Sequence, residues 1–199
     1  VNLYYAKSLL GSKDYYSAGY QFESFVKWYP YSKYAEEALF QAAYCKYLEA
    51  PDYTLDQTLT KQSMDAFQEY IEKYPNSERV AEANKLMDEL RENLIEKDYQ
   101  NAFNYYKTMQ YHAACVSFKR FLNDYPDVSQ KRENAMYYIV LAGYKYANNS
   151  VEDKLKERFE EAILDYERYS VVFANMKDEK KRQELENIYN ESKIKYNGL

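Results

Sequence analysis

Residues 15–30 read YYSAGYQFESFVKWYP, and residues 111–126 read YHAACVSFKRFLNDYP. Both stretches end in Tyr-Pro, and both carry alanine at the fourth position and phenylalanine at the eighth and eleventh. Spacings of three and four place these side chains on one face of a helix. Proline ends such a helix because it lacks an N–H and disfavours helical geometry in the preceding residue. Each stretch is therefore predicted to be an amphipathic helix that stops at its Tyr-Pro pair.

The pattern extends upstream and recurs elsewhere in the chain. Ala6 and Ala102 each stand nine residues before the first tyrosine of their stretch, and Phe67 precedes another Tyr-Pro pair, Tyr74-Pro75. Small, aromatic and proline residues at these intervals are typical of tetratricopeptide repeats, in which two antiparallel helices form each unit. The sequence therefore predicts an all-α, tetratricopeptide-repeat-like solenoid of antiparallel helix pairs wound into a right-handed superhelix. The residues predicted to form the repeat core are Ala6, Ala18, Phe22, Phe67, Ala114 and Phe118.

Longer offsets organise the repeats. The first and third repeats match at an offset of 96 residues, and the second and fourth at 99. We therefore expect a single helical repeat domain over residues 1–199, with repeats at about 1–30, 31–75, 78–126 and 130–174 and a final helix at 177–195. The expected helices are 1–11, 14–29, 33–49, 57–74, 78–107, 110–125, 131–147, 152–174 and 177–195. The stretch 78–107 holds no proline or glycine, which favours one long helix.

Composition narrows the function classes. The chain carries a net charge of −5 with no basic stripe, so we expect no nucleic-acid partner. His112 is the only histidine, and no nucleophile signature or glycine-rich phosphate loop accompanies it. One histidine and two separated cysteines, Cys45 and Cys115, cannot complete a tetrahedral metal site. We therefore predict no enzyme activity, no catalytic residues, no metal and no cofactor, and we expect both cysteines to be small buried residues.

The 26 tyrosines are too numerous to be explained by the repeat core alone. The first helix of each pair lines the concave face in this architecture, and tyrosine offers large contact area at low entropic cost. The candidate peptide groove consists of Tyr4, Tyr5, Tyr34, Gln41 and Tyr44. Packing between helices explains these residues equally well. Trp28, the only tryptophan, is predicted to be packed, which argues against a carbohydrate-binding platform.

One segment is more specific than a generic repeat. Residues 53–77 read YTLDQTLTKQSMDAFQEYIEKYPNS, in which Asp56-Gln57-Thr58 precedes a helix ending Tyr-Pro-Asn-Ser. The chain resembles the BamD family of outer-membrane protein assembly lipoproteins in this segment, in its third repeat and in residues 150–158. The family's lipidated N-terminal cysteine and first repeat are not seen, so we expect an N-terminally trimmed member, in which any signal peptide or lipidated cysteine would lie upstream of Val1.

The resemblance implies a non-catalytic scaffold of the β-barrel assembly machinery on the periplasmic face of the outer membrane, touching the membrane only through that N-terminal lipid. The implied partners are the periplasmic domains of the central barrel subunit, other assembly lipoproteins and unfolded outer-membrane proteins. Arg132 falls where the family places a basic, partner-facing residue, although an ordinary surface arginine explains it equally well. The element Asp56-Gln57-Thr58 also has the simpler interpretation of a helix cap. The alternative function is that of a generic tetratricopeptide adaptor that binds a peptide in its concave groove.

Overall fold

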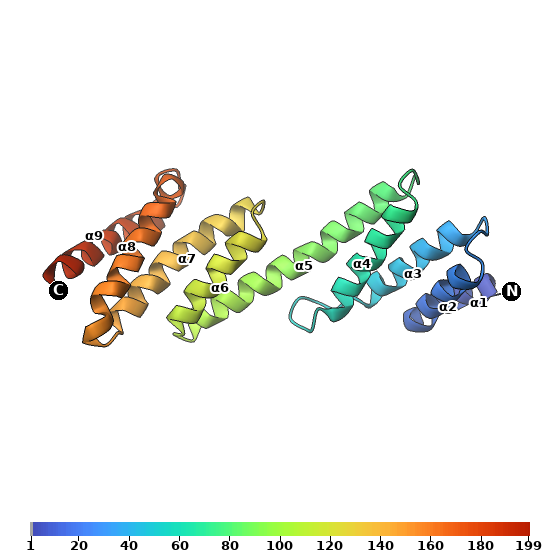
Figure 1. The fold of residues 1–199 in the computed structure, drawn as a ribbon, viewed down its shortest axis with the longest axis horizontal. Coiled ribbons are helices and arrows are strands. Elements are labelled where there is room, and N and C mark those ends of the chain that lie inside the picture. The colour runs from blue at the N-terminus through green and yellow to red at the C-terminus, as the bar shows by residue number, and fades with distance from the viewer. Residues whose placement is uncertain (1) are drawn as a thin grey trace. The chain divides into compact units, whose positions relative to one another are not determined.

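The computed structural model describes residues 2–199, apart from the side chains of residues 129 and 130. In this part of the chain every regular element is a helix, which confirms the predicted all-α, tetratricopeptide-like fold. The helices, drawn in Figure 1, are α1 (Asn2–Gly11), α2 (Tyr15–Trp28), α3 (Ala35–Glu49), α4 (Thr58–Lys73), α5 (Val80–Lys107), α6 (Tyr111–Asp124), α7 (Ser129–Asn148), α8 (Glu152–Ala174) and α9 (Glu179–Gly198).

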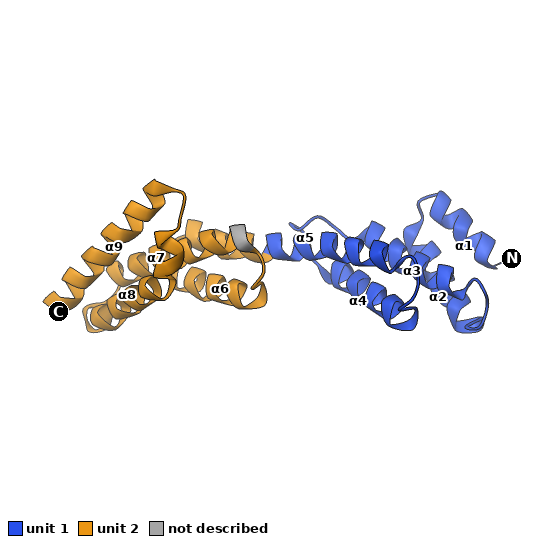
Figure 2. Cartoon of the chain, turned by 90° about the horizontal axis from the view of Figure 1, so that it is seen from above, with its two compact units in different colours: residues 1–97 blue, residues 98–199 orange. Residues whose placement is uncertain are grey.

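The chain divides into two compact units, one ending at Lys97 and the other beginning at Asp98 (Figure 2). The boundary falls inside α5, which runs for 28 residues without a break, as the lack of proline and glycine between 78 and 107 predicts. In the first unit α1 packs on α2, α2 on α3 and α3 on α4. In the second α6 packs on α7, α7 on α8, and α9 on both α7 and α8. That residues 1–199 behave as one domain stays a prediction.

The three Tyr-Pro pairs end their helices with the same backbone geometry. Tyr29, Tyr74 and Tyr125 have φ between −130° and −128° and ψ between 58° and 70°. Each donates its N–H to the carbonyl oxygen four residues earlier and then leaves the helix. The proline that follows excludes helical geometry at the tyrosine, so the sequence signal and the structural outcome have one steric cause.

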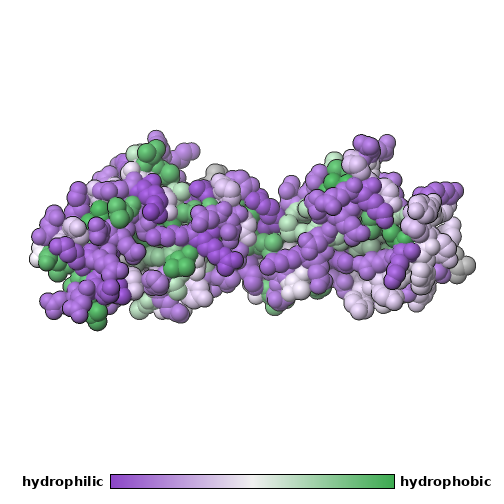
Figure 3. All heavy atoms as spheres, viewed as in Figure 1, coloured by the Kyte–Doolittle hydropathy of each residue, from purple (hydrophilic) through white to green (hydrophobic). Residues whose placement is uncertain are grey.

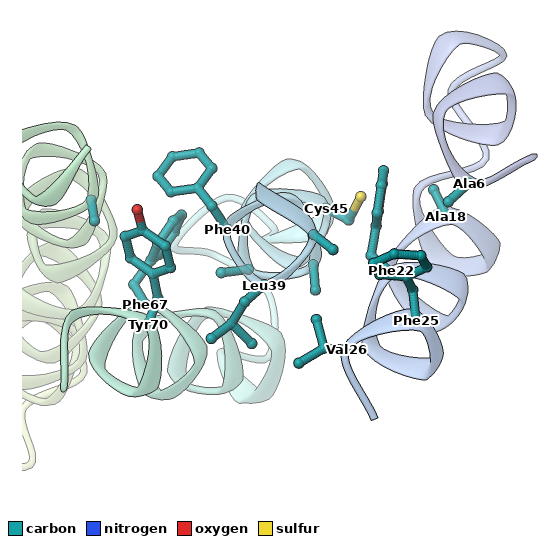
Figure 4. Close-up of a cluster of buried hydrophobic side chains, with 14 of the residues drawn as sticks. Ala6, Ala18, Phe22, Phe25, Val26, Leu39, Phe40, Cys45, Phe67 and Tyr70 are labelled. Carbon is teal, nitrogen blue, oxygen red and sulfur yellow. The ribbon is translucent and has the colours of Figure 1, made fainter. Parts of the chain in front are cut away.

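The core of the first unit is built from alanines and aromatic rings (Figure 4). Ala6 of α1 and Ala18 of α2 are fully buried, and their small side chains let the two helices approach closely. In the next pair the ring of Phe40 on α3 lies 5.7 Å from Phe67 and 5.2 Å from Tyr70 on α4, with edge-to-face geometry. All six residues predicted for the repeat core are fully buried: Ala6, Ala18, Phe22, Phe67, Ala114 and Phe118.

The offset of 96 residues extends to the backbone dihedrals. Lys13 and Met109 both have positive φ, 64° and 61°, and they are the only non-glycine residues that do so in the described chain. In each case the residue's N–H bonds the carbonyl three residues earlier and the next N–H reaches back five residues. This pattern closes a helix through a left-handed residue. The turns between α1 and α2 and between α5 and α6 are therefore the same structure.

The two copies of this turn differ in how they begin the following helix. The Asp14 carboxylate accepts the N–H of Ser17 at 3.2 Å, whereas Gln110, the matching residue before α6, makes no side-chain cap. We expect Gln110→Asp to raise the free energy of unfolding by about 1 kcal/mol, because an aspartate at this position satisfies a free N–H and complements the helix dipole. Urea unfolding followed by circular dichroism measures it. Asp14→Ala is the control and should lose a similar amount; equal stability of wild type and Gln110→Asp would contradict the argument.

Helix α9 is parallel to α7 and in register with it. Four side-chain hydrogen bonds join the two helices at a constant offset of 47 residues: Asn134 with Lys181, Tyr137 with Glu184, Tyr144 with Glu191, and Asn148 with Lys195. A constant offset requires parallel helices, because in an antiparallel pair the residue numbers rise along one helix while those of their partners fall. Helix α9 therefore occupies the place that the first helix of a fifth repeat would take.

Candidate peptide-binding groove

A groove opens at the beginning of the first unit, between α1 and the connection from α2 to α3. It encloses about 500 Å³. Because the Tyr-Pro pair turns the chain away from α2, Tyr29 and Ser32 come to face the first turns of α1. The residues that line the groove are Asn2, Leu3, Tyr4, Lys7, Phe25, Tyr29, Ser32 and Tyr34.

The structure brings two of the five predicted groove residues together. Tyr4 and Tyr34 both line the cavity, and both are exposed. Tyr5 is also exposed, but it is not among the lining residues. Gln41 and Tyr44 lie further along α3 and are half-buried. The ring of Tyr44 stacks on those of Phe40 and Tyr47, at 6.4 and 5.8 Å, so Tyr44 takes part in packing between residues of one helix.

Charge in the groove is limited and paired. Lys7 Nζ lies 2.8 Å from Glu37 Oε1, with both side chains partly exposed, so the pair is worth at most about 1 kcal/mol. Lys33 Nζ lies 5.0 Å from the centre of the Tyr34 ring, in cation–π contact. Further along α3, the side-chain oxygen of Gln41 is buried without a hydrogen-bond partner. The groove is therefore mainly an aromatic surface with hydroxyl groups and one ammonium at its rim.

Sequence reasoning missed two features of this region. Tyr29 was interpreted only as the end of a helix, although its ring packs on Phe25 at 5.2 Å and lines the groove. Trp28 was predicted to be packed, and this was wrong, since its side chain is 59% exposed. Trp28 is the last residue of α2, and the buried positions Ala18, Phe22 and Phe25 follow a different face of that helix. Adjacency to Tyr-Pro therefore says nothing about burial.

A second groove lies in the second unit and was not anticipated. It encloses about 560 Å³ between the C-terminal part of α5 and α6, and its lining is largely polar. The Tyr125 hydroxyl donates to Asp98 at 2.8 Å, and Arg120 pairs with Asp124 at 3.2 Å. These side chains satisfy one another, so the groove offers less apolar contact than the one at α1.

The element Asp56-Gln57-Thr58 fixes the loop before α4. The Asp56 carboxylate accepts the N–H of Thr58 at 2.9 Å, and hydrogen bonding by the Thr58 side chain and then by this N–H lowers the pKa of Asp56. The buried Gln57 amide donates to the carbonyls of Asp52 and Leu55 and accepts from the Thr60 hydroxyl at 2.8 Å. From α5, Lys97 donates to the carbonyl oxygen of Leu55 at 2.5 Å. The motif therefore has a structural role in shaping a long connection.

Arg132 also has a structural role. Its guanidinium donates to the carbonyl oxygens of Leu122 and Tyr125, at 2.7 and 3.4 Å, at the C-terminal end of α6. The last carbonyl groups of a helix are not all satisfied within it, and a cation beside them is favoured by the helix dipole. That Arg132 also contacts a partner stays a prediction.

We expect Arg132→Ala to lower the free energy of unfolding by about 1.5–3 kcal/mol, because it leaves two half-buried carbonyls without a charged donor. Denaturant unfolding of the purified chain measures the loss. Lys177→Ala, which removes an exposed lysine from the same unit, is the control. If Arg132→Ala unfolds like the wild type, the capping argument fails.

Within residues 2–199 no group of three or more His, Cys, Asp and Glu side chains is placed to hold a metal ion. That the chain has no metal and no enzyme activity stays a prediction. His112 is exposed, with its ring 5.0 Å from that of Tyr146. Cys45 and Cys115 are buried free thiols, and burial raises the pKa of each to about 12, so neither is a nucleophile at neutral pH. No described helix is long and apolar enough to cross a bilayer.

Comparison with known proteins shows the family of this chain. A family model described as "Outer membrane lipoprotein" (YfiO) matches residues 1–158. The chain is also similar to a protein of Caulobacter vibrioides named outer membrane protein assembly factor BamD, with 28% identity over 120 residues. That alignment covers 60% of this chain and 39% of the relative, well under half of the relative's length. Because the family model matches most of its residues, the chain belongs to this family of outer membrane lipoproteins.

Proposed function

We propose that the chain is a non-catalytic scaffold subunit of the machinery that folds and inserts β-barrel proteins into the outer membrane. The proposal is supported by the family assignment and by the name of the Caulobacter relative. The observation that carries it is an open, aromatic groove at the first helix pair of a tetratricopeptide-like array. In this proposal the protein acts at the periplasmic face of the outer membrane.

The groove fits an extended segment of an unfolded outer-membrane protein. Its volume of about 500 Å³ is in the range of sites that enclose a few side chains. Tyr4, Tyr29 and Tyr34 offer rigid rings with few rotatable bonds, so they lose little entropy when a segment binds. Their hydroxyls, together with Ser32, supply hydrogen bonds to a peptide backbone. Such a segment alternates apolar and polar side chains, which suits an aromatic surface with a polar rim.

Fluorescence anisotropy with a labelled peptide that copies the last strand of an outer-membrane barrel tests this step. The double variant Tyr4→Ala/Tyr34→Ala should bind at least about tenfold more weakly, since aromatic anchors dominate such interfaces. Tyr105→Ala removes an exposed tyrosine from the second unit and serves as the control. Equal affinity of the double variant and the wild type would remove the groove from the proposal.

The second part of the proposal concerns the central barrel subunit and the other assembly lipoproteins. We propose that the second unit, which contains Arg132, binds the periplasmic domains of the central subunit. A pull-down with those purified domains tests this. Arg132→Ala is assayed beside Gln110→Asp/Arg132→Ala, in which the improved helix cap offsets part of the lost stability. If both variants fail to bind, Arg132 belongs to the interface. If the double variant binds again, Arg132 only stabilises the end of α6.

The generic adaptor remains the alternative function. In this alternative the chain binds a peptide in the same groove but is not a subunit of the β-barrel assembly machinery. Binding of the peptide by a chain that fails to capture the central subunit's domains would favour the adaptor over the assembly scaffold.

A further inference from the structure

Exposed aromatic side chains are concentrated at one end of the chain. Among the described residues nine tyrosine, tryptophan or phenylalanine side chains are exposed, and eight of them precede residue 35. Figure 3 shows this end of the first unit in pale shades, the colour of residues in the middle of the hydropathy scale such as tyrosine and tryptophan. Tyr4, Tyr29 and Tyr34 belong to the peptide groove. The others require a separate explanation.

Four of these residues lie on α2 or just beyond it. Tyr16 and Tyr20 are one helical turn apart on the face of α2 that points away from its buried residues Ala18 and Phe22. Trp28 ends the helix, about 80° around its axis from Tyr20, and Tyr31 follows in the connection to α3. Their exposed fractions are 76% for Tyr16, 62% for Tyr20, 59% for Trp28 and 99% for Tyr31. We call these four residues the α2 aromatic surface.

The third repeat provides an internal control for this surface. At the offset of 96 residues, the counterparts of Tyr16, Tyr20, Trp28 and Tyr31 are His112, Val116, Asp124 and Asp127. These four are exposed as well, so exposure at these positions follows from the repeat itself. The presence of aromatic side chains does not follow from the repeat, because α6 folds on the same plan without them. These side chains are therefore not required for folding, and contact with a partner would explain them.

Charge in the same region is opposite in sign to that of the rest of the chain. Residues 1–34 hold four lysines and two carboxylates, a net charge of +2, while the whole chain carries −5, which leaves −7 on residues 35–199. Lys13, Lys27 and Lys33 are all exposed and lie close to the aromatic residues in sequence, and Lys27 also lines a hollow with residues of α3 and α4. The one carboxylate on this face of α2, Glu23, is paired with Lys46 of α3 at 2.7 Å. The surface is therefore aromatic and basic.

We propose that the α2 aromatic surface rests on a lipid bilayer that carries anionic headgroups. The tyrosine and tryptophan rings lie at the depth of the headgroups, with their polar atoms toward water, and the three lysines contact lipid phosphates. Tyrosine and tryptophan favour this zone of a membrane, and lysine extends its charge to it. The lysines favour this occupant over a protein partner, because protein interfaces are depleted in lysine although they are enriched in tyrosine and tryptophan. The proposal rests on membership in an outer membrane lipoprotein family and is independent of the peptide groove.

This contact adds to what the sequence predicts. A single acyl chain holds a protein on a membrane only marginally, and stable attachment takes a second signal such as a basic or amphipathic patch. The α2 aromatic surface supplies such a signal and also fixes which face of the first helix pair meets the bilayer. The groove between α1 and the α2–α3 connection is then held close to the membrane.

The experiment uses the fact that Trp28 is the only tryptophan. The 199-residue chain is titrated with vesicles of phosphatidylethanolamine and phosphatidylglycerol, and both tryptophan emission and co-sedimentation are recorded. We expect the Trp28 emission to move to shorter wavelength on binding. The variant Tyr16→His/Tyr20→Val/Tyr31→Asp, which keeps Trp28 and copies the third repeat, should partition about tenfold more weakly. Lys13→Gln/Lys27→Gln should lose about fivefold per lysine on these vesicles and little on neutral phosphatidylcholine.

Controls separate the possible occupants. Val171→Ser/Ile194→Ser removes exposed apolar side chains from the second unit and should bind vesicles like the wild type. No binding of the wild type to either kind of vesicle overturns the proposal, and so does unchanged binding of the triple tyrosine variant. Self-association in sedimentation velocity that this variant abolishes, without vesicle binding, would assign the surface to a second copy of the chain. Loss of peptide binding in Tyr4→Ala/Tyr34→Ala leaves the membrane contact untouched, so the two proposals fail separately.

Discussion

Phe22→Ala and Phe118→Ala are each expected to lower the free energy of unfolding by about 3–5 kcal/mol, because a large ring leaves a cavity that helices cannot fill. Both rings are fully buried and occupy the same position in the first and third repeats. Phe118 of α6 touches rings from both neighbouring helices, Tyr99 of α5 at 5.7 Å and Tyr138 of α7 at 5.6 Å. Truncation therefore loosens contacts to two helices at once.

Denaturant unfolding monitored by circular dichroism measures both losses. The two variants lie in different compact units, so they also reveal whether the units unfold together or in separate steps. Val116→Ala, an exposed residue of the same helix as Phe118, is the control and should change stability little. Losses below about 1 kcal/mol at both phenylalanines would mean that the repeat register is wrong, since core truncations of this size cost several times more.

The second large effect is expected from Lys119→Met, which should cost about 3–5 kcal/mol at neutral pH by leaving a buried carboxylate without its main partner. Asp165 of α8 is only 4% exposed, and Lys119 Nζ of α6 lies 2.7 Å from its Oδ2. Arg168 also approaches Asp165, at 3.5 Å, but from the exposed surface. It therefore screens the charge less than the lysine does.

The double variant Lys119→Met/Asp165→Asn isolates the cause. Removing both charges should restore most of the loss, because a neutral amide is cheaper to bury than an unpaired carboxylate. Thermal and urea unfolding of the wild type, both single variants and the double variant form a complete cycle. If the double variant is as unstable as Lys119→Met alone, the cost arises from packing of the lysine stem and not from charge.

Much of the fold could be predicted because its signals are local. Tyr-Pro ends a helix through the sterics of neighbouring residues, and the lack of proline and glycine in 78–107 lets one helix continue to Lys107. The repeat then follows from the spacing of alanines and phenylalanines on one face. These inferences need no knowledge of which side chain comes from the next helix.

The functional surfaces were less predictable because they depend on partners that are distant in sequence. Periodicity assigns Lys119 to a helix face but does not show that Asp165 arrives from α8 to meet it. The burial of Gln57 depends on the path of the connection before α4, and the capping role of Arg132 depends on where the next helix begins. The exposure of Trp28 could not be predicted for the same reason, because the residue before a Tyr-Pro pair has no fixed neighbour.

The parallel register of α9 on α7 has a consequence for the motions of the chain. Helix α9 is held by the buried Leu185 and Ile188, by the stacking of Tyr189 on Tyr166 of α8 at 4.3 Å, and by side-chain hydrogen bonds near its surface, whereas the hydroxyl of the buried Ser192 finds no partner. A terminal element held in this way opens at a lower free energy than the core, without global unfolding. Amide hydrogens of α9 should therefore exchange with deuterium well before those of α7. Each such opening bares the flank of α7 that carries Tyr137 and Tyr144, for as long as the helix stays away.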